Sequence, residues 1–544
     1  MKRALLTSMI LLVCAVSTTQ ASAKELSPTR QLRRAYLSLT MQEPPVERYE
    51  ALLEAADAGA FIEEEIDQLL EGQAFHETLM DWGHEYIPIP EYPRPNPVWR
   101  SSKAAHSDFC GEDTLHANAI GIFNHLGDDP AICDDPSARV EFTIPWWDPS
   151  TMVKVIGQAA NADLLYDGQD CSVSRVGLNW VKPSVQGCGC GPNLTFCHRQ
   201  WPGDQFERGY GSTTRLDGNN HHPNSQRRSL HDEPARFLAY IVTQGRDFSD
   251  LILSDYTIVD RGLYHMYTRQ GHHSQVYPER AMESEWVHDF TSADQWREVK
   301  FSEMHPHLID DPDYAYDPRV DEGEPLGLPS SGVLTMLGPM AAWPRPRVRA
   351  ARWLESLACD EFSPPETPVE FPPYRSDPAT EGVCLHCHVR LDAAAMSFKR
   401  TFDRGGSVAG IGAWKIQNLL SYNTDRVRFE NSMLPNTVMT PVTEEQIEAN
   451  PNARLIDFMP PGQTLLGQES DGTIGPRGFA KVMVSSGAFD QCAVRRAYER
   501  FGGRTFDVGV EADELQQRID AFVSSGRDMK GLIRDIVLNT KEGF

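Results

Sequence analysis

The stretch Phe61-Ile62-Glu63-Glu64-Glu65-Ile66-Asp67-Gln68-Leu69-Leu70 decides how this chain folds at its start. Its apolar residues Ile62, Ile66, Leu69 and Leu70 recur at the spacing of one helix face, so we expect Glu63, Glu64 and Glu65 to point outward. This pattern predicts helices across residues 27–86. A proline-rich stretch from Ile87 to Pro97 follows and indicates a linker.

The same periodicity returns later in the chain. Residues 233–244 and 248–253 have apolar positions at helical spacing. Near the C-terminus two further helices are predicted, with Gly526 between them and apolar positions at Leu515, Ile519, Phe522 and Val523, and then at Met529, Leu532, Ile533, Ile536 and Val537. We therefore predict a mainly α, multidomain helical protein.

Residues 98–230 differ from the helical segments in composition and pattern. They contain short β-like runs such as Val140-Glu141-Phe142-Thr143-Ile144, frequent Gly, Asn and Pro, and six cysteines. This indicates a loop-rich, disulfide-stapled insert with short β-strands. The predicted organisation is a signal peptide, an N-terminal helical domain, the Cys-rich insert, a central helical domain, a haem-attachment segment and a C-terminal helical domain, at residues 1–23, 24–92, 93–230, 231–316, 317–410 and 411–544.

The first 23 residues have the features of an export signal. Met1-Lys2-Arg3 is basic, residues 4–16 are mostly apolar, and Ala21-Ser22-Ala23 matches an Ala-x-Ala cleavage site. No later stretch offers eighteen apolar residues in a row, so no transmembrane segment is expected in the mature chain. We expect a periplasmic location, or secretion or display at the cell surface.

The chain is acidic, with 51 Lys and Arg against 77 Asp and Glu and a formal net charge of −26. Such a charge repels nucleic acid and excludes the nucleic-acid-binding classes. It could steer a basic protein partner toward the surface, although acidic surfaces are also common in exported proteins that have no such role.

The 11 cysteines fit an oxidising compartment. Cys14 would leave with the signal peptide, and Cys384 and Cys387 belong to the motif described next. The remaining cysteines are even in number, which suits disulfides without fixing their pairing. Cys110 and Cys133 form a plausible local pair.

The strongest chemical motif is Cys384-Leu385-His386-Cys387-His388, which matches the Cys-x-x-Cys-His pattern of covalent haem attachment. Cysteines three residues apart lie on one face of a helical turn and can form thioethers with the two haem vinyl groups. His388 can then turn its imidazole toward the iron as an axial ligand. We expect one covalent haem c in a cytochrome c-like segment.

Three other interpretations of the motif are less consistent with the sequence. A thioredoxin-like redox pair needs a preceding strand, which the proline-rich lead-in from Pro364 to Pro378 does not provide. A zinc site needs a second Cys/His pair nearby, and none follows. A plain disulfide gives no reason for His388.

The sixth iron ligand is expected among the downstream methionines Met396, Met433, Met439 and Met459. Met459 is preferred because Phe458-Met459-Pro460-Pro461-Gly462 resembles the Met-Pro loop of small cytochromes c. Met396 is expected to pack in the core of a helix that follows the motif. A methionine ligand raises the reduction potential and suits electron transfer, whereas an open position suits peroxide chemistry.

Two weaker features favour structural interpretations. The cluster Cys188-Gly-Cys190 with Cys197-His198 has the wrong spacing for a second haem and indicates disulfides in a Gly-rich loop. The acidic loop at residues 305–329 lacks the spacing of an EF-hand and reads as a solvated loop.

Several segments together resemble the exported multidomain proteins of the planctomycete and myxobacterial cytochrome c group. The resemblance rests on Leu32 to Thr40, Asp247 to Tyr267, Gly332 to Cys359, Cys384 to Gly406 and residues 479–538. The insert has no counterpart in that group, and Ala393-Ala394-Ala395-Met396 stands where the group usually has an Asp-Pro-Leu-Gly type sequence. The resemblance implies haem binding and export, and no particular substrate.

Cys359 and Cys492 lie outside the insert, in segments that resemble the helical regions flanking the haem motif of that group. We expect a disulfide between them, which would tie the C-terminal helices to the haem segment.

Three functions are compatible with these features. They are electron transfer, haem enzyme activity of the peroxidase type, and surface binding or scaffolding with an ancillary haem. Electron transfer is preferred because the cofactor is well marked and no Ser/His/Asp, paired-carboxylate or phosphate-loop pattern stands out.

Overall fold

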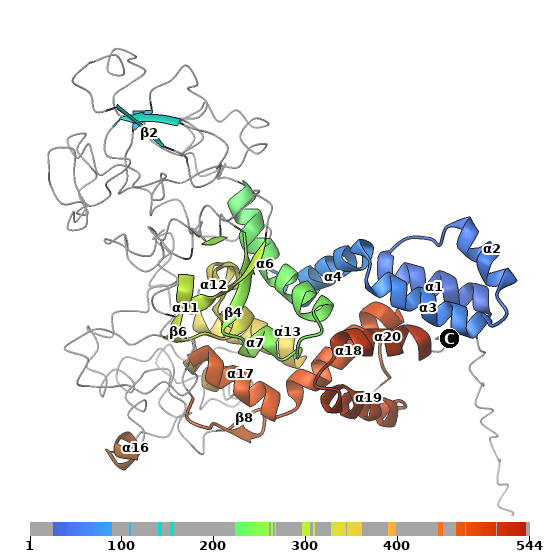
Figure 1. Cartoon of the computed structure of the whole chain (residues 1–544). Coiled ribbons are helices and arrows are strands. Elements are labelled where there is room, and N and C mark those ends of the chain that lie inside the picture. Colours follow the sequence, from blue (N-terminus) through green and yellow to red (C-terminus); the bar gives the residue numbers. More distant parts are fainter. Residues whose placement is uncertain are drawn as a thin grey trace, which may run out of the picture.

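The structure is a computed structural model. It describes residues 26–89, 108–109, 140–143, 153–156, 224–260, 263–264, 267, 296–304, 308–309, 328–343, 345–361, 390–398, 444–449, 464–473, 475–507 and 509–539. This part of the chain is mainly helical, with a few short strands, as the sequence predicts (Figure 1). None of its helices is long and apolar enough to cross a bilayer.

Four helices form the N-terminal region, as predicted for residues 27–86. They are α1 (Pro28–Thr40), α2 (Val46–Glu54), α3 (Ala58–Leu70) and α4 (Gln73–Tyr86). The Asp57 side chain caps α3 by accepting hydrogen bonds from the backbone N–H groups of Gly59 and Ala60. Ile62 and Ile66 of α3 are buried, so the predicted apolar face packs inward.

Glu65 departs from the prediction that it points outward, because its side chain is only 2% exposed. On α3 it comes three residues after Ile62, so it lies at the edge of the buried face. Tyr36 donates a hydrogen bond to Glu65 Oε2 over 2.9 Å, and Arg48 Nε donates to the same oxygen over 2.9 Å. These partners on α1 and α2 compensate the buried carboxylate, which the local pattern of α3 alone could not reveal.

The central region combines helices with short sheets. Its helices are α6 (Asn224–Thr243), α7 (Asp250–Leu253), α11 (Phe301–Met304), the 3₁₀-helix η4 (Gly332–Thr335), α12 (Leu337–Ala342) and α13 (Pro346–Ala358). Strands β4 (Tyr256–Val259) and β5 (Arg297–Lys300) pair antiparallel, with Thr257 opposite Val299, whereas β6 (Leu308–Ile309) and β7 (Leu328–Pro329) pair in parallel.

Three short strands lie within the predicted insert. Strand β3 (Val153–Ile156) pairs antiparallel with both β1 (Asp108–Phe109) and β2 (Val140–Thr143). Strand β2 falls on the β-like run that the sequence singled out. The other residues of the insert up to 223 lie outside the described residues.

The C-terminal region consists of α17 (Gly475–Ser485), α18 (Ala488–Gly502), α19 (Ala512–Ser524) and α20 (Met529–Asn539), preceded by α16 (Glu444–Ala449) and by the hairpin of β8 (Thr464–Leu465) and β9 (Gln468–Glu469). Gly526 separates α19 from α20 and has a φ of 76°, a left-handed conformation that glycine adopts without strain. Both final helices are therefore confirmed. Val523 is 41% exposed, because it lies at the margin of the apolar stripe that buries Leu515 and Phe522.

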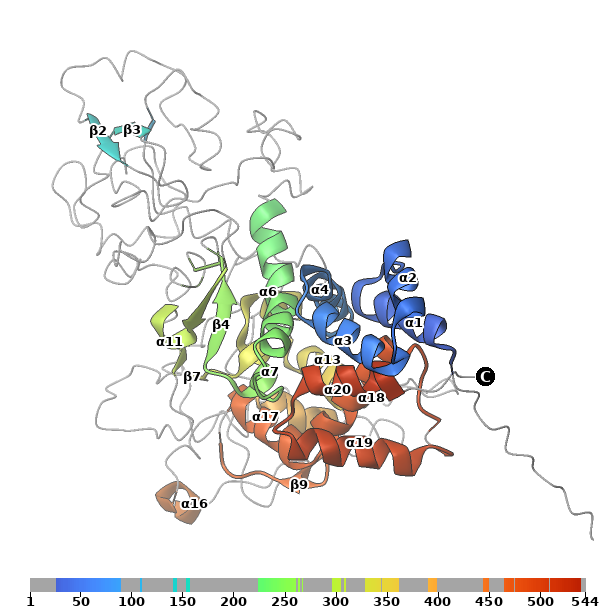
Figure 2. The same ribbon diagram turned by 45° about the vertical axis from the view of Figure 1, so that its right-hand side comes forward.

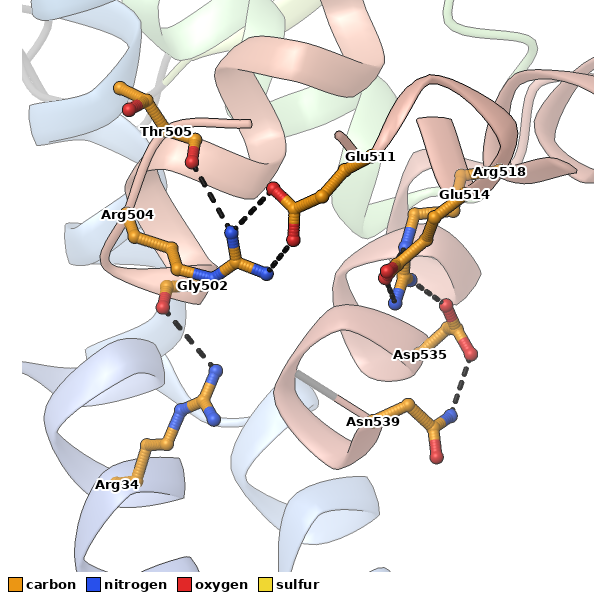
Figure 3. Close-up of polar contacts among 9 residues, drawn as sticks. All are labelled: Arg34, Gly502, Arg504, Thr505, Glu511, Glu514, Arg518, Asp535 and Asn539. Carbon is orange, nitrogen blue, oxygen red and sulfur yellow. Dashed lines mark hydrogen bonds and ion pairs between the residues drawn. The ribbon is translucent and has the colours of Figure 1, made fainter. Parts of the chain in front are cut away.

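The N-terminal and C-terminal helices lie side by side (Figures 1 and 2). Figure 3 shows Arg34 of α1 directed at the backbone carbonyl of Gly502 at the end of α18, over 3.4 Å. In the same view Arg504 and Glu511 form paired hydrogen bonds of 2.7 and 2.6 Å, which bracket the turn between α18 and α19. Arg518 of α19 contacts Glu514 and Asp535, so it links α19 to α20.

One aromatic cluster joins the three helical regions. Phe248, just before α7, stacks with Trp82 of α4 at a centroid distance of 6.4 Å and with Phe489 of α18 at 5.8 Å. Trp82 also meets Phe501 of α18 edge-on at 5.3 Å. The buried core is therefore continuous between segments that are more than 400 residues apart in the chain.

Candidate functional site

The predicted haem residues Cys384, Cys387 and His388 lie outside the described residues, as do Met459, Cys110 and Cys133. The structure does describe residues before and after the motif in the chain. It places Cys359 before the motif, residues 390–398 directly after it, and Cys492 farther on. These are the described residues that lie on either side of the motif in the chain.

Cys359 and Cys492 form the predicted disulfide, with their Cα atoms 5.3 Å apart. Cys359 ends α13 in a left-handed conformation with a φ of 51°. Cys492 is a buried residue of α18. The bridge therefore fastens the end of α13 to α18, and the prediction is confirmed.

This disulfide closes a loop with a sequence separation of 133 residues. The loop contains the whole Cys384–His388 motif and also Met459. Cross-linking a loop of this length removes chain entropy from the unfolded state, which stabilises the folded state by about 5 kcal/mol in the loop-entropy model. The segment that bears the motif is thus tied at both ends to one pair of helices.

Residues 390–396 are helical and begin two positions after His388. Ala393, Ala394, Ala395 and Met396 are all buried, and Met396 is 2% exposed. Met396 is therefore a packing residue, as predicted. Phe398 continues the apolar contact by meeting Phe479 of α17 at a centroid distance of 5.3 Å.

Two ion pairs hold this helical segment against α13. Arg347 of α13 donates from Nε to Asp392 over 2.6 Å and from Nη2 over 3.1 Å, and Asp392 is 1% exposed. Arg390 donates from Nη1 to both carboxylate oxygens of Asp360, over 2.6 and 2.8 Å. Arginine–carboxylate pairs with two short hydrogen bonds fix orientation as well as distance. The chain that leaves the motif is consequently held in a defined place.

A buried cation, Arg349, lies close to the same segment. Its guanidinium is 5.8 Å from the ring centroid of Phe398. Nε donates to the Trp343 carbonyl over 3.0 Å, and Nη2 donates to the Met340 carbonyl over 3.2 Å. Burial lowers the pKa of Arg349 to about 9, because the charged form loses its hydration. Arg349 therefore links α12 to α13 close to the segment that follows the motif.

Two buried carboxyl groups lie between α6 and the end of β4. Glu233 Oε1 accepts hydrogen bonds from Thr257 over 3.0 Å and from Tyr267 over 2.7 Å. Asp260 accepts from Ser229 over 2.5 Å and from the backbone N–H of Leu263 over 2.7 Å.

Burial raises the pKa of Glu233 to about 8 and that of Asp260 to about 6, since each carboxylate loses hydration. The charge of Asp260 raises the pKa of Glu233 further. No spacing rule in the sequence links the two, because packing of β4 against α6 brings them together.

A third cluster unites His84 of α4 with His231 and Asp232 of α6. Each offers a ligand atom, and these atoms all lie within 4.8 Å of one another. The two imidazole rings stack at a centroid distance of 4.2 Å, and His84 Nε2 lies 3.4 Å from Asp232 Oδ1. Burial and the neighbouring His231 lower the pKa of His84, so its imidazole is neutral at pH 7 and keeps a lone pair for a metal ion. No spacing pattern in the sequence indicates this cluster, because its two histidines stand far apart in the chain.

Comparison of the chain with protein families, with curated proteins and with solved structures found no match. The functional argument therefore rests on the residues and on the geometry given above.

Proposed function

We propose that this protein is an exported c-type cytochrome that carries one covalent haem on Cys384 and Cys387, with His388 as an axial iron ligand. The observation that carries the proposal is the motif Cys384-Leu385-His386-Cys387-His388, in a chain whose first 23 residues have the pattern expected of an export signal. Export matters because bacterial haem attachment takes place outside the cytoplasm. The resemblance to the planctomycete and myxobacterial cytochrome c group points the same way.

The surroundings of the motif support a prosthetic group with a fixed position. The Cys359–Cys492 disulfide closes the loop that contains the motif. The Arg347–Asp392 and Arg390–Asp360 pairs then hold the helical segment that starts two residues after His388. Fixed chain positions on both sides of the motif suit a covalent haem, since the axial histidine must meet the iron.

Electron transfer is the activity that we propose for this haem, with Met459 as the sixth ligand and an electron donor or acceptor protein as the partner. The acidic balance of −26 favours a basic partner, because opposite charges speed association. When bound, the haem would supply one-electron chemistry at the iron. The chain itself would supply His388, Met459 and the docking surface.

Haem attachment can be tested directly. The full-length protein, produced in an exporting host that has haem-maturation machinery, should retain haem after denaturation and show the added mass of one haem. The Cys384→Ala/Cys387→Ala variant should lose it, whereas His388→Ala should keep a covalent haem whose iron ligation is disturbed. A denatured native protein without haem would overturn the proposal.

The sixth ligand separates electron transfer from peroxidase chemistry. The ferric native protein should show the weak near-infrared sulfur-to-iron band, and Met459→Ala should lose it. Met396→Ala is the matched control and should keep the band, because Met396 is buried in the helical core. A high-spin native iron that binds cyanide readily would contradict Met459 ligation and favour a haem enzyme.

A further inference from the structure

The His84–His231–Asp232 cluster lies where α4 and α6 approach closely. A Cβ atom added to Gly83 would lie 2.6 Å from the Cα atom of Ala235, so only glycine allows the two helices to come this near. His84 is the next residue on α4, and Asp232 is three residues before Ala235 on α6. The close approach therefore brings the side chains of the cluster together across the helix pair.

The distances suit one small cation. Ligand atoms about 2 Å from a common zinc ion are separated by at most about 4 Å. The 3.4 Å between His84 Nε2 and Asp232 Oδ1 already meets this limit. The largest separation in the cluster is below 4.8 Å, so a shift of under about 1 Å in a side chain would complete the set.

The cluster also has unused coordinating capacity. His231 Nδ1 is buried and has no hydrogen-bond partner among the described residues. A buried polar atom without a partner is costly, and a metal ion would satisfy a ring of this kind. His84 and Asp232 have side chains that are 28% and 17% exposed, so an ion can reach them from solvent.

The cationic side chain of Arg236 lies beside the cluster on α6. Arg236 Nη2 lies 3.9 Å from Asp232 Oδ2, and its guanidinium lies 4.6 Å from the ring centroid of Trp296. Arg236 thus approaches the oxygen of Asp232 that is turned away from His84, and Oδ1 stays available.

We propose that His84, His231 and Asp232 bind a divalent transition-metal ion, with zinc as the best-fitting ion, at the junction of α4 and α6. Two imidazole nitrogens and one carboxylate oxygen match the ligand preference of zinc and leave a fourth position for water. His84 precedes the predicted insert at 93–230 and His231 follows it. The ion would therefore clip together the two chain segments that enter and leave the insert.

Calorimetric titration of the chelator-treated full-length protein with Zn²⁺ measures the number of bound ions and their affinity, and so tests this site. The native protein should bind one Zn²⁺ that both His84→Ala and His231→Ala fail to bind. Their affinity at this site should fall at least about 100-fold, because loss of even an outer-shell partner costs 10- to 100-fold. Asp232→Asn keeps the side-chain size and should weaken the same binding step, which guards against loss of fold in the histidine variants.

His76→Ala is the matched control, since His76 is another half-buried histidine of α4 and lies outside the cluster. It should bind zinc as the native protein does. The proposal is overturned if His84→Ala and Asp232→Asn bind zinc as tightly as the native protein does. It is also overturned if His76→Ala loses zinc binding to the same extent as the variants of the cluster. The haem plays no part in this readout.

Discussion

Replacement of Glu233 by glutamine should remove a pH-dependent loss of stability. Glu233 lies on α6 and has no exposed surface. Its Oε1 accepts hydrogen bonds from Thr257 and Tyr267, while Oε2 has no hydrogen-bond partner among the described residues. Glutamine keeps an oxygen acceptor for both hydroxyl groups and cannot ionise. The substitution therefore tests the charge of this group with little change in shape.

The sign and size follow from proton linkage. In the unfolded chain Glu233 titrates at its ordinary pKa of 4.5, and in the folded protein burial raises that pKa to about 8. Between these two pH values the folded state holds a proton that the unfolded state has released, so the free energy of unfolding falls as pH rises. Each pH unit costs about 1.4 kcal/mol, and the native protein loses about 3 kcal/mol between pH 4.5 and pH 7 through this group.

Urea unfolding followed by circular dichroism at several pH values between 4.5 and 8 measures this difference. The stability advantage of Glu233→Gln over the native protein should grow by about 3 kcal/mol from pH 4.5 to pH 7 and level off above pH 8. Asp260, whose pKa is raised to about 6, titrates in both proteins, so most of its contribution cancels and only the part that comes from its coupling to the charge of Glu233 stays in the difference.

Glu50→Gln is the control, because Glu50 is an exposed helical glutamate, and its stability should follow that of the native protein. A difference between Glu233→Gln and the native protein that stays constant with pH would refute the reasoning. It would mean that Glu233 titrates alike in the folded and unfolded states.

Three further changes test the contacts that hold the helices together. The Cys359→Ala/Cys492→Ala variant should have a free energy of unfolding about 5 kcal/mol lower than the native protein, because it opens a loop with a separation of 133 residues. Urea unfolding of both proteins under oxidising conditions measures this difference, and equal midpoints would contradict the prediction. Glu65→Ala should cost about 1–3 kcal/mol, since it leaves Tyr36 and Arg48 without their acceptor, whereas the exposed Glu64→Ala should change stability by under about 0.5 kcal/mol. Gly83→Ala should cost about 1–3 kcal/mol by overpacking against Ala235, measured as a lower thermal midpoint, and an unchanged midpoint would show that α4 and α6 separate without cost.

The sequence by itself determined the local features of this protein. Periodic apolar residues such as Ile62, Ile66, Leu515 and Phe522 predicted helices that the structure contains, because a helix repeats every few residues and its pattern is legible in one segment. Met396 is in the core, as its position only eight residues after His388 predicted. The Cys359–Cys492 disulfide was also predicted, from the resemblance of its two segments. The haem motif is local as well, and its prediction rests on the sequence.

Apart from this disulfide, only the tertiary structure decided which distant groups meet. Glu65 is buried because Tyr36 and Arg48 arrive from other helices, so the pattern of its own helix misplaced it. His84 meets His231 and Asp232 because Gly83 lets α4 approach α6 closely. Glu233 is held neutral at pH 7 because burial raises its pKa more than the hydrogen bonds from Thr257 and Tyr267 lower it. In each case the environment of the side chain depends on burial against residues that are remote in the chain. No periodicity within a single segment encodes such a contact.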